Sequence, residues 1–250
     1  KLSSVLLLSA LLLAQISAAV EPLAIGSRRE LFVDDFLIGQ LKGGAAQRLH
    51  QPQPREIVLL HDQPWEGSGS GYHSLFKDGD LYRLYYKAWH LEVEDGKVNT
   101  GSHPLFCCYA ESDDGIHWRR PELGLHEFNG SKANNIVIGH ESMGHAKPDG
   151  GHPAVFKDEN PDAPADARYK AIVRSRGEHG LLALKSADGL RWSPMSETPV
   201  ITDGAFDSQN LAFWDAHSGL YRAYWRYFTG GSTDGKTWKL TLRDAKFHDG

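Results

Sequence analysis

Ser112-Asp-Asp-Gly-Ile-His-Trp118 is the first of three heptapeptides in this chain that share the pattern Ser-x-Asp-Gly-x-x-Trp. The second runs from Ser186 to Trp192 and the third from Ser232 to Trp238. A turn that recurs at intervals of tens of residues indicates a repeat architecture. Asp-Gly permits the positive φ of a tight turn, and the Ser and Asp side chains can accept hydrogen bonds from its N–H groups. We therefore interpret these three Asp-Gly boxes as structural turns, each followed by a Trp that fills the gap to a neighbouring sheet.

A second marker precedes each Asp-Gly box: an aromatic-x-Asp turn followed by a Tyr and a basic residue. The aromatic residues are Phe76, Phe156 and Phe213, and the Tyr-basic pairs are Tyr82-Arg83, Tyr169-Lys170 and Tyr221-Arg222. Two markers in the same order, three times over, are hard to obtain by chance. We predict that the three Phe residues hold equivalent positions on the first hairpins of successive sheets.

Strand and turn patterns dominate the chain from Tyr72 onward. The first unit reads as four strands: residues 72–76, 81–89 and 105–110, and one beginning near Trp118. The second reads as residues 152–156, 168–174 and 181–185, with a Pro- and Asp-rich surface insertion at 160–167. The third has residues 210–213 and 220–228 but no room for a third strand before Ser232.

Radially repeated four-stranded sheets make a β-propeller. We expect an all-β chain whose antiparallel blades occupy residues 64–128, 150–200 and 205–250. Three blades cannot close a ring, so the propeller is expected to be incomplete here and the chain to be the N-terminal part of a longer protein.

The first 19 residues read as a secretory signal peptide. Lys1 is followed by an apolar run from Val5 to Ala14 and by Ser17-Ala-Ala19, a small-x-small cleavage pattern. The apolar run is too short to span a bilayer. We expect the mature propeller domain to span residues 20–250 and to be secreted or periplasmic.

The composition limits the partners. The net charge is −5 with both signs interspersed, which favours neither a nucleic acid nor an anionic membrane as a partner.

The two cysteines, Cys107 and Cys108, are adjacent, so on a strand their side chains point to opposite faces. We expect two packed thiols, with a strained vicinal disulfide as the alternative. No paired Cys-x-x-Cys is present, and His140, His145 and His152 near Asp149 fit no familiar zinc spacing. We expect neither a metal nor another cofactor.

Several motifs resemble secreted bacterial proteins, of the kind abundant in planctomycete-type genomes, from the five-bladed propeller glycoside hydrolase superfamily. They are Arg29 to Ile38 (RELFVDDFLI), Pro64-Trp-Glu66, Tyr82 to Tyr86, and Phe206 to Asn210 followed by Phe213-Trp-Asp215. The resemblance is to glycoside hydrolase families 32 and 43, which are invertase-like and arabinanase-like. The resemblance covers about residues 28–226. It is a specific indication of the architecture and only a weak indication of the substrate.

This resemblance implies three carboxylates that face a central funnel: a nucleophile or base, a transition-state stabilising Asp, and an acid. Asp207, before the first strand of a blade, matches the stabilising position. Glu66 and one of Asp34 or Asp35 are the candidates for the other two, Asp35 being carried forward because one of this pair on a strand must point inward. The sequence departs from the family pattern because Ser70-Gly-Tyr-His73 stands where a Trp-Met-Asn-Asp-Pro-Asn-Gly-like element is expected, and no Glu-Cys pair marks the acid.

Polar and aromatic residues at the strand entrances are the candidates for sugar binding. They are Tyr72 and His73 in the first blade, His152 in the second, Gln209 and Asn210 in the third, and Arg226, which could hold an acidic sugar.

Three functions follow from these residues. The first is hydrolysis of a polysaccharide or oligosaccharide in the funnel by paired carboxylates. The second is carbohydrate binding without catalysis. A third, sialidase-like reading rests on the Asp-Gly boxes alone, and it is weakened because no arginine triad can be assigned. A carboxylate pair about 5–10 Å apart favours hydrolysis over binding alone.

Overall fold

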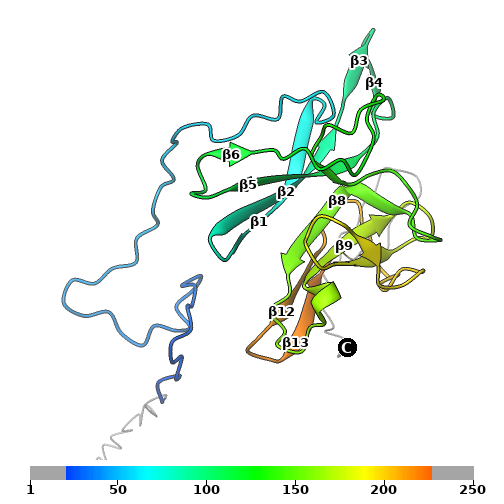
Figure 1. Cartoon of the computed structure of the whole chain (residues 1–250). Helices are drawn as coiled ribbons and strands as arrows, with labels where there is room; N and C mark the ends of the chain where they lie inside the picture. The colour runs from blue at the N-terminus through cyan, green and yellow to red at the C-terminus, as the bar shows by residue number, and fades with distance from the viewer. Residues whose placement is uncertain (1–20, 227–250) are drawn as a thin grey trace, which may run out of the picture. The chain divides into compact units, whose positions relative to one another are not determined.

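The computed structural model describes residues 21–226, which are built from strands and loops with one short 3-10 turn, η1 (Ala165–Ala167) (Figure 1). The chain divides into two compact units at Arg55/Glu56. The predicted signal peptide and the third Asp-Gly box lie outside the described residues. Within the described part, no helix has the length and apolar character needed to cross a membrane.

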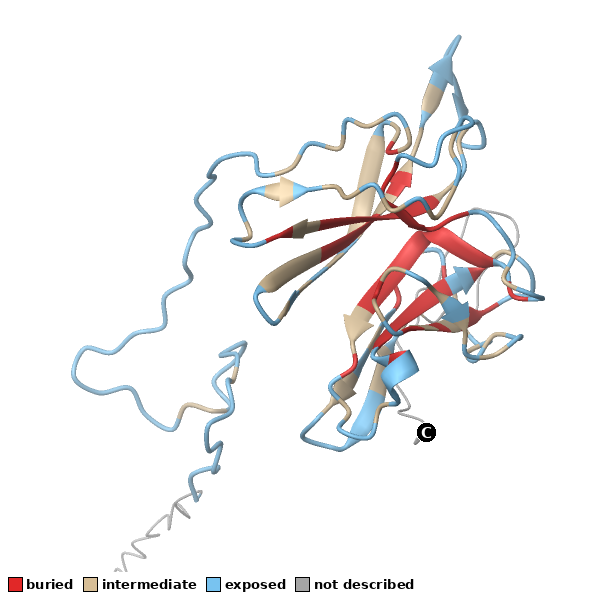
Figure 2. Ribbon diagram, viewed as in Figure 1, coloured by how far each residue is buried: buried red, intermediate tan, exposed pale blue. Residues whose placement is uncertain are grey.

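Residues 21–55 contain no strand, so the expected strand around Asp34 and Asp35 is wrong. Both aspartates are exposed, and Asp34 Oδ1 accepts a hydrogen bond from the Phe36 amide at 2.9 Å in a local turn. The apolar residues on either side of Asp34 and Asp35 are typical of a strand, yet a strand also needs a neighbouring strand for its backbone hydrogen bonds. No neighbour pairs with it among the described residues, and Leu31 remains 81% exposed. Figure 2 shows this stretch in pale blue.

The second unit begins with a sheet in the order β1-β2-β5-β6, in which every neighbouring pair is antiparallel. Its strands are β1 (Gly69–Asp78), β2 (Leu81–Trp89), β5 (Phe106–Ser112) and β6 (Trp118–Arg119). A short hairpin of β3 (Glu92–Glu94) and β4 (Lys97–Asn99) is inserted before β5, and β7 (Ile136–Ile138) pairs with the other end of β5. The four predicted strands of the first blade are therefore confirmed, whereas β3, β4 and β7 were not predicted.

The second sheet repeats this order as β8-β9-β10-β11. Its strands are β8 (Pro148–Lys157), β9 (Tyr169–Ser175), β10 (Leu181–Ser186) and β11 (Ser193–Pro194). Ile201 bridges Leu181 on β10, in the way that β7 pairs with β5. A third sheet contributes β12 (Leu211–Asp215) and β13 (Leu220–Tyr224). The described residues thus form two antiparallel blades with four strands in consecutive order, the first of which is extended by β7, and the first hairpin of a third blade. This is the all-β propeller architecture that the repeats predict.

Phe76, Phe156 and Phe213 occupy equivalent positions, as predicted. Each lies on the first strand of its sheet, opposite a basic residue on the second strand: Arg83, Lys170 and Arg222, respectively. The first strands also neighbour one another, because β8 contacts both β1 and β12.

The main core lies between the first two sheets (Figure 2, red strands). It joins Tyr85, Cys107 and Tyr109 of the first sheet to Val173 and Leu184 of the second. Cys108 packs in a separate cluster on the opposite face of the first sheet. Both cysteines are buried and free, so the prediction of two packed thiols is confirmed.

The two described Asp-Gly boxes have the same hydrogen bonds. In the first, Ser112 Oγ accepts from the Gly115 amide at 2.9 Å, and Asp114 Oδ1 accepts from the amides of Ile116 and His117 at 2.8 Å each. In the second, Ser186 and Asp188 make the matching bonds at the same distances. Gly115 and Gly189 have φ of +80° and +79°, which glycine adopts without strain. These are the turns that the sequence predicted.

The Asp of the second marker joins one sheet to the next. Asp78 pairs with Arg83 of its own sheet and accepts a hydrogen bond from the Tyr169 hydroxyl of the second sheet. Asp158 repeats this arrangement with Lys170 and with the Tyr221 hydroxyl, which donates at 2.7 Å. The marker therefore encodes a contact between sheets.

Candidate functional site

Tyr72, His152 and Gln209 stand at one repeat position, four residues before Phe76, Phe156 and Phe213. The structure brings them together where β1, β8 and β12 begin. The rings of Tyr72 and His152 have centroids 5.5 Å apart, and Gln209 Nε2 lies 3.5 Å from the Pro153 carbonyl oxygen. A hollow of about 470 Å³ follows, lined by His73 and Phe76 from β1, Val155 and Phe156 from β8, and Gln209 and Leu211. Three of the predicted sugar-binding residues and this hollow define the strand-entrance site.

Asp149 and His152 form a buried pair at the start of β8. Asp149 Oδ2 lies 2.8 Å from His152 Nδ1, and Oδ1 accepts from the Gly151 amide at 2.8 Å. Burial raises the pKa of Asp149, but the His152 ring, the Gly151 amide and the charge of Arg174 outweigh burial and lower that pKa below its usual value. The ionised carboxylate therefore holds the Nδ1–H of His152, and Nε2 is left without a hydrogen bond to any residue in the described part of the chain.

The close packing of β8 on β5 depends on glycine. A Cβ atom at Gly150 would lie 2.7 Å from the Ile138 carbonyl oxygen and 2.8 Å from the Cys107 amide nitrogen. The missing side chain allows the start of β8 to approach the first sheet, where His152 lies beside Tyr72.

Tyr72 has an unusual backbone for a tyrosine, with φ of +53°. It lies in a bulge between Gly71 and Ser74, where the register of β1 against β2 shifts. Bulges redirect side chains, and strained residues cluster at binding and catalytic sites. Lys87 of β2 places its ammonium 5.2 Å from the Tyr72 ring and 4.7 Å from the Trp89 ring.

His73 is exposed beside a second histidine. Its Nε2 lies 3.4 Å from His61 Nε2 and 3.5 Å from Ser70 Oγ. Contact of one part of the ring with the protein removes some of its hydration, and this partial burial and the neighbouring His61 both lower the pKa of His73. The ring is therefore neutral at pH 7 and suited to exchange hydrogen bonds with a hydroxyl-rich ligand.

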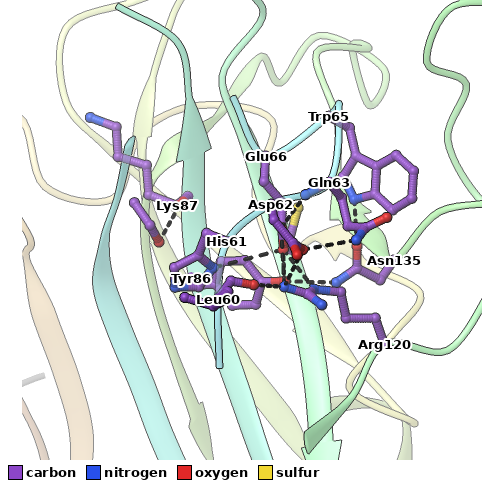
Figure 3. A network of polar contacts seen from close by, with 12 residues as sticks. Leu60, His61, Asp62, Gln63, Trp65, Glu66, Tyr86, Lys87, Arg120 and Asn135 are labelled. Carbon is purple, nitrogen blue, oxygen red and sulfur yellow. Dashed lines mark hydrogen bonds and ion pairs between the residues drawn. The ribbon is translucent and has the colours of Figure 1, made fainter. Parts of the chain in front are cut away.

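Glu66 belongs to a different environment, a buried polar network on the opposite face of the first sheet (Figure 3). Its Oε1 accepts from the Tyr86 hydroxyl at 2.5 Å and from Arg120 Nε at 2.9 Å, and its Oε2 accepts from the Gln63 amide at 2.9 Å. Burial raises the pKa of Glu66, but the His61 ring, Tyr86, the Gln63 amide and Arg120 together lower it to about 2. The residue is 1% exposed. These contacts hold Glu66 ionised.

The network continues through Asn135, which donates to the Tyr86 hydroxyl at 2.9 Å and accepts from Trp65 Nε1 at 2.6 Å. A smaller hollow of about 300 Å³ lies beside it, lined by Trp65, Arg120 and Asn135 among others. Trp65 and Glu66, adjacent in the sequence, are thus both anchored by residues far along the chain.

The other predicted site residues have local partners. Asp207 is exposed before β12 and pairs with Arg226, so one ion pair joins a predicted catalytic residue to a predicted sugar-binding residue. Asn210 is buried, and its Nδ2 donates to the Ser208 carbonyl oxygen at 2.8 Å, which holds the turn before β12. No hydrogen bond or ion pair joins Asp207 to Glu66 among the described residues. Asp35 belongs to the first unit.

Sequence reasoning missed two members of the strand-entrance site. Asp149 was considered only as a metal neighbour, and Lys87 was not considered. The repeat position shared by Tyr72 and His152 was the signal that could have drawn attention to Asp149, three residues before His152. Within residues 21–226, no group of three or more His, Cys, Asp or Glu side chains is arranged to hold a metal ion.

Comparisons with known proteins give only distant matches. No family model and no curated protein matches the chain. Among solved structures, the chain is similar to a BT0996–RGII complex, with 16% identity and a TM-score of 0.34 over 72% of this chain and 59% of that one. It is also similar to a glycosyl hydrolase from Bacteroides ovatus, with 16% identity and a TM-score of 0.33 over 62% and 46% of the two chains. A structure described as a glycoside hydrolase matches at 15% identity and a TM-score of 0.33, over 72% of this chain and 59% of that one. The chain therefore spans about half the length of these proteins.

Proposed function

We propose that this chain forms part of a carbohydrate-active β-propeller that binds a sugar at the strand-entrance site. The observation that carries the proposal is that Tyr72 of β1 and His152 of β8, which share one repeat position, have ring centroids 5.5 Å apart. Gln209, at the same repeat position before β12, lies 3.5 Å from the Pro153 carbonyl oxygen. Aromatic rings offer flat faces to sugar rings, while imidazole and amide groups pair with hydroxyls. The bulge and the positive φ of Tyr72 direct its ring to this position.

Binding is tested by titrating the full-length protein with a panel of oligosaccharides in a calorimeter. Tyr72→Ala should weaken binding at least tenfold, whereas Tyr224→Ala, which removes an exposed tyrosine from β13, should not. Equal affinities of wild type and Tyr72→Ala would contradict the proposal.

We further propose that the full-length protein hydrolyses glycosidic bonds with Asp207 as one carboxylate. Asp207 precedes an inner strand and its side chain is 63% exposed beside Arg226, so a substrate can reach it. Asp207→Asn keeps the shape and removes the charge, so kcat should fall more than KM changes if the contact belongs to the transition state. Turnover is measured on polysaccharides and aryl glycosides, with Asp203→Asn in the same loop as the control. Turnover that survives Asp207→Asn within a few-fold would remove Asp207 from the site.

A non-catalytic carbohydrate-binding propeller is the second candidate, and the environment of Glu66 favours it. A carboxylate that acts as acid, base or nucleophile must reach the substrate. Glu66 is 1% exposed and both of its oxygens are engaged by other residues, so we assign it to holding the loop before β1. A full-length protein that binds glycans and cleaves none of them would support this candidate.

A further inference from the structure

We infer that the strand-entrance site selects acidic sugars, and that Lys87 binds the carboxylate of a uronic acid there. This inference rests on the proposed sugar binding and names the substrate class of the same site.

Lys87 is a partly buried cation without an acidic partner. No carboxylate oxygen of residues 21–226 forms an ion pair with its ammonium, although most other partly buried cations of the second unit have one, as Arg83 has in Asp78 and Lys170 in Asp158. Its ammonium instead lies near the faces of Tyr72 and Trp89. Aromatic faces attract a cation but do not neutralise it.

Asp149, whose negative charge acts on Lys87, is already engaged. Burial lowers the pKa of Lys87, and the charge of Asp149 opposes this effect through space. The two oxygens of Asp149 bond to His152 and to the Gly151 amide. A ligand carboxylate would therefore meet a cation whose hydration is already reduced by burial, beside an aspartate whose two oxygens are already bonded. Charge-assisted hydrogen bonds are strongest in such surroundings.

The neighbouring groups suit the rest of a sugar. With Nδ1 held by Asp149, the His152 ring has Nε2 left to form a hydrogen bond with a sugar hydroxyl. Tyr72 lies beside both Lys87 and His152. A cation, an imidazole that can form a hydrogen bond and an aromatic ring, all on neighbouring strands, match a sugar ring that carries one carboxylate and several hydroxyls.

The test compares galacturonate with galactose, and glucuronate with glucose, each as matched oligosaccharides binding to the full-length protein. Wild type should prefer the acidic sugar by about tenfold, which corresponds to one charge-assisted contact, and the preference should shrink at high salt. Lys87→Met keeps the aliphatic stem over the rings and should abolish the preference, measured as the ratio of the two affinities. Lys185→Met removes the same charge from β10, where the lysine pairs with Asp166, and should leave the preference intact.

Unfolding curves of each variant show whether it is folded, and Lys87→Gln serves as a second variant if Lys87→Met is not. Equal affinity of wild type for acidic and neutral sugars would overturn the inference and leave the proposed sugar binding intact. A preference for acidic sugars that persists in the Lys87→Met variant would have the same two consequences. Failure of wild type to bind sugars of either kind would overturn the proposed function and this inference with it.

Discussion

At the scale of single residues, Glu66 shows how surroundings decide the chemistry of a side chain. Its position in a Gly- and Ser-rich loop gives no sign of burial, and the resemblance to glycoside hydrolases makes it a catalytic candidate. In the structure Arg120 and Tyr86 bind the same carboxylate oxygen. The low pKa that results suits a structural anion.

The stability of the protein should depend on Glu66 in a way that pH reveals. Because the pKa in the folded state is about 2 and the ordinary value is 4.5, ionised Glu66 stabilises the fold fully above about pH 4.5. This contribution is lost as the pH falls from 4.5 toward 2, and it is on the order of 3 kcal/mol. Glu66→Gln should therefore lower the free energy of unfolding by about 3 kcal/mol at pH 7. The substitution also leaves Arg120 with the exposed Asp62 as its acidic partner.

Urea unfolding at pH 7 and pH 3 measures this effect. The difference between wild type and Glu66→Gln should narrow at pH 3, whereas Glu122→Gln, an exposed glutamate beside the same hollow, should change stability by less than about 0.5 kcal/mol at either pH. A difference that is independent of pH would show that the carboxylate is not held ionised.

At the scale of elements, the Asp-Gly boxes act as turns whose Trp residues close gaps. Trp192 packs against the main core and meets the Tyr85 ring edge-on, with centroids 6.4 Å apart. Tyr85 belongs to the first sheet and Trp192 to the second, so the box at the end of β10 also stabilises the packing between the sheets. Trp118 packs on the opposite face of the first sheet.

Trp192→Ala should reduce the free energy of unfolding by about 3 kcal/mol, because the site is only partly exposed and cannot collapse fully. Sugar binding per folded molecule should stay unchanged. Chemical unfolding and calorimetric titration check the two parts, with Ile116→Ala, an exposed position of the first box, as the control. Loss of binding at unchanged stability would mean that the boxes are functional and not structural.

At the scale of the whole molecule, the repeated Asp–Tyr contact links successive sheets. Tyr82, Tyr169 and Tyr221 hold one repeat position at the second strand, and two of them donate to the Asp of the preceding sheet. The hydroxyl of Tyr82 makes no hydrogen bond within the described range. Its sheet is the first of the series in the chain.

Removing one hydroxyl tests this link. Tyr169→Phe should lower the free energy of unfolding by about 1.5 to 3 kcal/mol, the range for a hydrogen bond to a charged group. Tyr82→Phe is the matched control and should cost less than about 0.5 kcal/mol. Equal costs for the two variants, measured by urea unfolding, would show that the contact between the sheets contributes no stability of its own.

Local patterns in the sequence determined much of the architecture. The Asp-Gly boxes, the Phe-x-Asp turns and the strands around them are encoded by residues close together in the chain, because turn chemistry and alternation act over a few positions. For this reason the hairpins and the equivalence of Phe76, Phe156 and Phe213 were predictable. The same reasoning failed at Asp34 and Asp35, where the pattern of a strand is present but no pairing partner is found among the described residues.

Only the tertiary structure decided the chemistry of the site. Arg120 lies 54 residues from Glu66 in sequence, and Tyr72 meets His152 across two sheets. Contacts of this kind depend on how the sheets pack against each other. Sheet packing produces no periodic pattern among neighbouring residues of the sequence, so the contacts could not be predicted from it. The sequence determined which strands form and where they turn. The packing of β8 on the first sheet decided that Asp149 holds His152. It also left Lys87 without an acidic partner in the described part of the chain.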